Sequence, residues 1–101
     1  MEKHAIASVL ELLARSDMEN ARKALQELSS GVKDERERGM VMAAGGILTS
    51  MTKAREGAFQ SWDEQKISRA ARMIARNQMA DDFDRGFAET LLEYAKMKKK
   101  E

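Results

Sequence analysis

A row of four basic side chains is the feature of this sequence best suited to bind a ligand. The row consists of Lys66, Arg69, Arg72 and Arg76, and no acidic residue stands among them. Spacings of three and four place such residues along one side of a helix. The planar guanidinium of arginine fits phosphate and carboxylate groups well. The basic row therefore predicts a surface that binds either the phosphate backbone of a nucleic acid or an acidic protein.

The same row also fits a helix face that is merely solvated. In that interpretation the arginines pair with the acids of the following segment, which are Asp81, Asp82, Asp84, Glu89 and Glu93. Two observations count against nucleic acid. The 18 basic and 17 acidic residues leave a net charge of only +1, and no aromatic side chain stands between the arginines to stack on bases.

Little in the sequence is arranged for metal binding or catalysis. The acids Asp81, Asp82 and Asp84 carry oxygen ligands that suit Mg²⁺, but acids at a helix N-terminus also cap its amides. The chain has no cysteine and a single histidine, His4, which excludes thiol nucleophiles and His-cluster metal sites. No glycine-rich phosphate loop occurs. We expect no metal, no cofactor, no catalytic residue and no small-molecule substrate, and therefore expect that the chain is not an enzyme.

The elements that position these residues are helices. Apolar residues recur with helical spacing in five segments, which cover residues 2–15, 17–29, 35–57, 62–79 and 82–97. A frayed basic tail follows at 98–101. No proline interrupts the chain, and short turns make neighbouring helices antiparallel. The predicted fold is all-α, a compact single-domain bundle of four to five mostly antiparallel helices spanning residues 1–101.

Capping residues predict where these helices begin and end. Capping boxes are expected at Ser16 with Glu19, Asp34 with Glu37, and Ser61 with Glu64. Either Asp81 or Asp82 is expected to start the last helix. Gly31 is expected to end the second helix in the left-handed conformation that glycine adopts at least cost.

The longest segment, 35–57, carries a second candidate surface. Small residues recur every four positions there, at Gly46, Ser50, Ala54 and Ala58, and such spacing lets another backbone approach closely. Two adjacent glycines in mid-helix cost about 2 kcal/mol relative to two alanines, which favours tight packing or a kink at Gly45 and Gly46. Most methionines fall on core faces, whereas Met42 projects from the polar side. We define Met42, Gly45, Gly46 and Ser50 as the small-residue seam.

The sequence thus predicts a small non-catalytic helical module for protein–protein interaction or homo-oligomerisation. The small-residue seam would contact another protein or a second copy of the chain, as in a homodimer. The alternative is an accessory protein that binds nucleic acid through the basic row on the fourth helix. The longest apolar run, Met40–Leu48, is too short to span a membrane, so we expect a cytoplasmic protein without a membrane segment.

Overall fold

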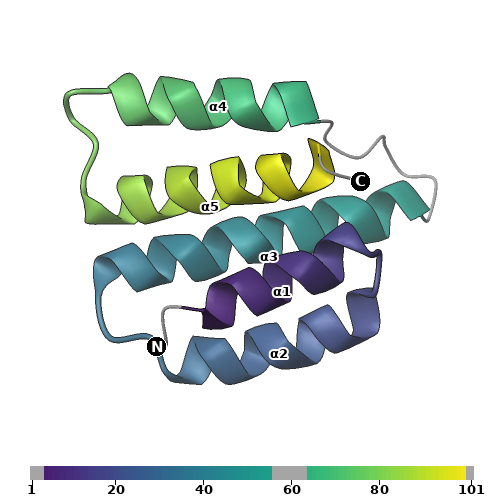
Figure 1. Cartoon of the computed structure of the whole chain (residues 1–101). Helices are drawn as coiled ribbons and strands as arrows, with labels where there is room; N and C mark the ends of the chain where they lie inside the picture. Colours follow the sequence, from purple (N-terminus) through teal and green to yellow (C-terminus); the bar gives the residue numbers. More distant parts are fainter. Residues whose placement is uncertain (1–3, 56–63, 100–101) are drawn as a thin grey trace.

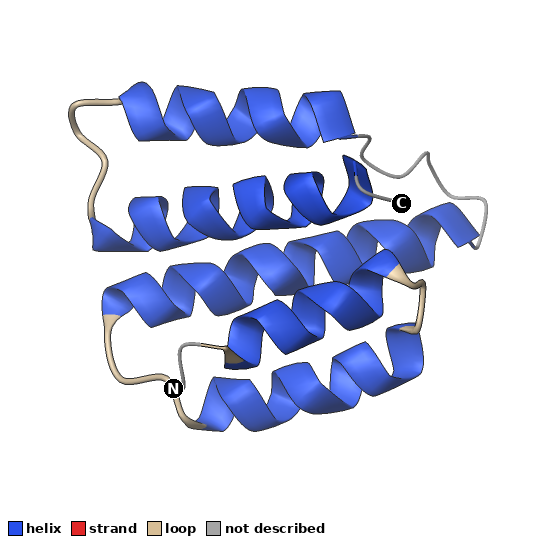
Figure 2. Cartoon of the chain, in the orientation of Figure 1, coloured by secondary structure: helices blue, strands red, loops and turns tan. Residues whose placement is uncertain are grey.

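The computed structural model describes residues 4–55 and 64–99. Within these ranges, the apolar segments form five helices. The helices are α1 (Ala5–Ala14), α2 (Met18–Ser30), α3 (Glu35–Arg55), α4 (Glu64–Arg76) and α5 (Asp82–Lys99). The described residues contain no strand, so all regular structure there is helical (Figure 2). The expected all-α class is confirmed.

Two helices that run in the same direction form the centre of the bundle. α3 and α5 lie side by side, and α4 covers the outer side of α5 (Figure 1). In the α1–α2 hairpin, α1 packs against both α3 and α5, and α2 packs against α3. Helices that follow one another in the chain are antiparallel, as short connections require. The radius of gyration, 12.9 Å, matches the value of about 13 Å for a compact domain of this length.

A single apolar core joins residues of all five helices. On α1 the predicted face is buried through Ile6, Val9, Leu10 and Leu13. α3 contributes Ala43, Ala44, Ile47 and Leu48, and α5 contributes Ala88, Leu91, Tyr94 and Ala95. Among the described side chains of α4, Ile67 and Ala71 are buried in this core, and Ile74 is half-buried against it.

Two glycines allow α3 and α5 to approach each other closely. A Cβ atom on Gly39 would overlap the carbonyl oxygen of Phe83, and a Cβ atom on Gly86 would overlap that of Arg36. The obstacle is backbone in both cases, so a side chain there would push the helices apart. The close contact of backbones expected in α3 therefore occurs at Gly39.

The expectation of tight packing at Gly45 and Gly46 is wrong. A Cβ atom on Gly46 would meet no neighbouring atom within 4 Å, and one on Gly45 would lie at an ordinary 3.7 Å from Leu25 Cδ2. α3 runs as one helix through both residues.

The cap between α1 and α2 lies one residue later than expected. The Asp17 carboxylate, not the Ser16 hydroxyl, accepts a hydrogen bond from the Asn20 amide, at 3.4 Å. Ser16 has a φ of 63°, and its amide donates to the carbonyl of Leu13 at 3.0 Å. Ser16 thus ends α1 in the left-handed conformation expected at Gly31, whose own φ is −105°.

The caps expected at Asp34 and Asp81 are confirmed. Asp34 Oδ1 accepts from the amide of Glu37 at 2.8 Å, and Glu37 Oε1 accepts from the amide of Lys33 at 2.9 Å. Asp81 Oδ1 accepts from the amide of Asp84 at 2.9 Å. The cap proposed for Ser61 falls in 56–63, outside the described residues.

Two helix ends differ from the sequence prediction. α4 stops at Arg76 rather than at residue 79, because the side chain of Asn77 accepts from the amide of Met79 at 2.9 Å and forms a turn. α5 continues to Lys99 rather than to residue 97. Its last turn therefore includes part of the tail expected to fray.

Candidate functional site

The candidate site lies on α4, a helix at the edge of the bundle in the part of the chain that the structure describes. α4 packs against α5 and against no other described helix, and it forms one edge of the bundle in Figure 1. Ile67 and Ala71 face α5 and are buried. The opposite face of α4 is therefore left to the solvent.

That face carries the basic row. The side chains of Arg69, Arg72 and Arg76 are exposed. Lys66 belongs to the first turns of α4, but its side chain lies outside the described part. No ion pair or hydrogen bond of these three arginines occurs among residues 4–55 and 64–99.

Among the described residues, no acid of α5 pairs with Arg69, Arg72 or Arg76. Glu89 Oε2 pairs instead with Arg36 Nη2 of α3, at 2.5 Å. The hydrogen bond to Glu89, and then its charge, raise the pKa of Arg36. The carboxylates of Asp81 and Asp84 accept hydrogen bonds from each other's backbone amides. The paired-face interpretation of the arginines thus finds no contact to support it in the described structure.

An exposed methionine stands within the basic row. Met73 is 69% exposed and lies four residues after Arg69 and three before Arg76, so all three share one surface of α4. The prediction that Met42 is the exceptional exposed methionine is wrong, since Met79 is 86% exposed as well. The sequence already indicated that Met73 is exposed, because Met73 directly follows Arg72 and shares a helix face with Arg69 and Arg76.

The small-residue seam does not form one exposed face. Met42 is exposed, at 55%, but Ser50 is buried, at 6%. Gly45 lies against the side chain of Leu25. Ser50 is thus not available to a partner in the folded chain. The four residues therefore do not form the single contact surface that the sequence predicted, because Met42 faces the solvent and Ser50 faces the interior.

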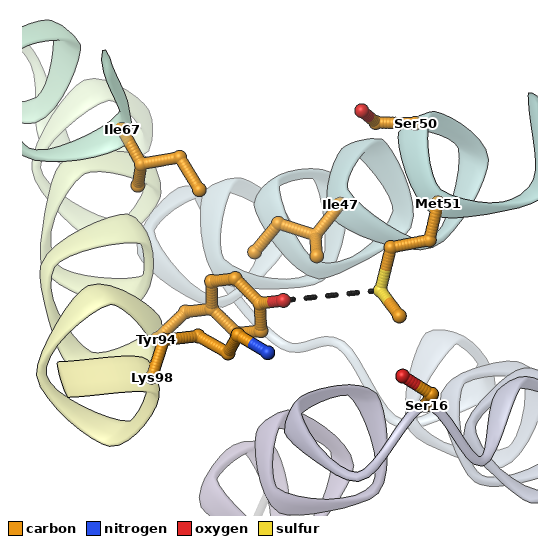
Figure 3. A pocket seen from close by; sticks show the side chains of 7 residues that line it. All are labelled: Ser16, Ile47, Ser50, Met51, Ile67, Tyr94 and Lys98. Carbon is orange, nitrogen blue, oxygen red and sulfur yellow. Dashed lines mark hydrogen bonds between the residues drawn. The ribbon is translucent and has the colours of Figure 1, made fainter. Parts of the chain in front are cut away.

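A cavity of about 140 Å³ lies between α3, α5, the N-terminal half of α4 and the turn after α1. Figure 3 shows the side chains that line it, which are Ser16, Ile47, Ser50, Met51, Ile67, Tyr94 and Lys98. The hydroxyl of Ser50 is buried and has no hydrogen-bond partner among the described residues. Sequence reasoning missed this site, because its residues come from distant segments and share no motif.

The described residues hold no group of three or more His, Asp or Glu side chains placed to bind a metal ion. Within the same ranges, no helix has both the length and the hydropathy needed to cross a membrane.

Comparisons with protein-family models, with curated proteins and with solved structures found no match for this chain.

Proposed function

We propose that this protein is a non-catalytic helical module that binds an acidic segment of another protein through the outer face of α4. The surface consists of Arg69, Arg72, Met73 and Arg76. The observation that carries the proposal is that three exposed arginines surround an exposed methionine and none is paired within the described structure. Cations without internal partners are available to the carboxylates of a partner.

The methionine favours a protein over a nucleic acid. Arginine and methionine are both enriched at protein interfaces, and a flexible thioether side chain adapts to an apolar partner surface. A phosphate backbone is charged and offers no apolar surface for Met73 to pack against. A net charge of +1 also supplies little of the long-range attraction on which nucleic-acid binding depends.

The geometry of α4 indicates the kind of segment that fits. Arg69, Met73 and Arg76 follow one another at spacings of four and three on a single helix face. A partner helix with carboxylates at the same spacings and an apolar residue between them would meet each charge and cover Met73. We therefore propose an amphipathic acidic helix as the partner segment.

Charge reversal on α4 tests this proposal. The variant Arg72→Glu/Arg76→Glu should lose a partner that the wild-type protein retains on an affinity column, because both contacts become repulsive. Arg15→Glu/Arg22→Glu is the matched control, since both residues are exposed and the net charge changes equally. The retained protein should then bind in purified form, and lysine substitutions in its acidic segment should restore binding to the α4 variant.

Equal retention of the purified partner by both variants would contradict the proposal. A partner that proves to be RNA or DNA would establish the alternative function of the basic row. In that case the plot of log affinity against log salt concentration should have a slope of about −2.7, since three arginines would each contribute about −0.9.

A further inference from the structure

We propose that the cavity between α3 and α5 binds a short hydroxycarboxylate. This site is separate from the α4 surface and goes beyond the proposed function. From the sequence we expected no small-molecule substrate, and no motif points to these residues. The proposal rests on the cavity, on a buried hydroxyl without a partner, and on the cation that lines the same space.

Ser50 supplies the first argument. Its side chain is buried, and its hydroxyl has no hydrogen-bond partner in the described structure. It lines the cavity, and in Figure 3 its oxygen is turned toward the side on which Ile67 lies. Buried polar groups in folded proteins are nearly always hydrogen-bonded. A ligand hydroxyl in the cavity would both accept from Ser50 and donate to it.

Tyr94 and Lys98 supply the polar groups on the side of the cavity away from Ser50. They lie four residues apart on α5, so they reach the cavity from the same side of that helix (Figure 3). The Tyr94 hydroxyl donates to Met51 Sδ at 3.8 Å, and a thioether sulfur is a weak acceptor. A carboxylate is a much stronger acceptor and also carries the charge that complements the Lys98 ammonium.

The walls and the volume limit the size of the ligand. Ile47, Ile67 and Met51 give the cavity apolar walls between the two polar poles. A cavity of about 140 Å³ is close to the size that accommodates benzene, so it holds about six to eight non-hydrogen atoms. A carboxylate with a short carbon chain and one hydroxyl group meets these requirements together.

Two-dimensional NMR titrations of the full chain with 3-hydroxybutyrate, butyrate and butyramide test this assignment. We expect saturable shifts at the amides of Ser50 and Tyr94, with 3-hydroxybutyrate binding most tightly and the uncharged butyramide most weakly. Lys98→Met should weaken 3-hydroxybutyrate about tenfold or more, since a charge-assisted hydrogen bond is lost. Ser50→Ala should weaken it about fivefold and leave butyrate unchanged, because only the hydroxyl loses its partner.

The charge-reversed α4 variant separates this site from the proposed function. Arg72→Glu/Arg76→Glu should bind 3-hydroxybutyrate as the wild type does, because neither arginine lines the cavity. Ser50→Ala removes a buried group without a partner, so the variant should remain folded and its binding measurable. The absence of saturable shifts with all three compounds would show a cavity filled by water alone and would overturn the proposal. Equal affinity for butyrate and butyramide would overturn it as well.

Discussion

Arg36 of α3 and Glu89 of α5 form an ion pair in which Nη2 lies 2.5 Å from Oε2. The pair joins the two central helices beside the point where Gly86 meets the backbone of Arg36. It also turns the Glu89 carboxylate toward α3 and away from the arginines of α4. Glu89 is thus paired with Arg36 and not with Arg69, Arg72 or Arg76.

We expect this ion pair to contribute little to stability. Both side chains are about half exposed, at 56% and 50%, and such pairs contribute about 0.2–1 kcal/mol. A double-mutant cycle with Arg36→Gln and Glu89→Gln, followed by urea denaturation, measures the coupling energy. A coupling well above this range would show that the pair acts as a buried one.

The titration of Arg36 determines how its share of this coupling energy depends on pH. Glu89 raises the pKa of Arg36, and a base with a raised pKa stabilises the folded state wherever it is protonated. That contribution is lost only as pH rises through the folded-state pKa, which lies far above neutral. Titration of Arg36 should therefore leave the coupling unchanged between neutral and moderately alkaline pH. A decrease within that window would contradict this assignment.

The glycines of the bundle should respond to alanine in opposite directions. Gly39→Ala should destabilise the protein by about 1–3 kcal/mol, the usual cost of overpacking, because the new methyl group overlaps the backbone of α5. Gly46→Ala should stabilise it by about 0.5–1 kcal/mol through helix propensity, since that position is open. Urea denaturation of both variants gives the comparison. Equal effects at the two positions would contradict the α3–α5 packing.

The turn between α1 and α2 offers a test of the corrected cap. Asp17→Ala should cost about 1 kcal/mol, because the amide of Asn20 loses its acceptor. Ser16→Gly should instead stabilise the protein by about 1 kcal/mol, because glycine tolerates a φ of 63°. Thermal unfolding of the two variants gives both values. A loss of stability on Ser16→Gly would show that the Ser16 side chain, rather than Asp17 alone, caps α2.

Charge reversal on α4 should be neutral for folding. Arg72 and Arg76 are exposed and have no partner in the described structure, so Arg72→Glu/Arg76→Glu should change the free energy of unfolding by less than about 0.5 kcal/mol. Chemical denaturation checks this expectation. A larger loss would indicate that the arginines stabilise the bundle, and a defect in partner binding would then need another explanation.

The local pattern of residues was sufficient to predict the helices and part of their ends. The apolar face of α1 is buried as its spacing indicates, and the caps at Asp34 and Asp81 follow from short polar side chains just before helical segments. The end of α4 was missed because Asn77 satisfies a backbone amide by itself. The Asn77 side chain competes with the helical carbonyls for this amide within a single turn. The spacing of apolar residues carries no information about that competition.

Contacts between distant segments were not predictable in the same way. Gly39 and Gly86 are ordinary single glycines in the sequence, whereas the adjacent Gly45 and Gly46 drew attention to a place where nothing packs closely. Which glycine meets another backbone depends on how α3 and α5 cross. The exposure of Arg69, Arg72 and Arg76 follows from the residue pattern of α4 alone, whereas the pairing of Glu89 with Arg36 depends on how α5 packs against α3.

The central claim, that the outer face of α4 binds an acidic protein, is tested most directly by a photoreactive residue at Met73. A benzoylphenylalanine at this position should crosslink to one protein, at an acidic segment, and Arg72→Glu/Arg76→Glu should abolish the adduct. The same residue at Met42, which is exposed on α3, is the matched control and should give no such adduct. Crosslinking from Met42 alone, or from Met73 to RNA or DNA, would contradict the claim.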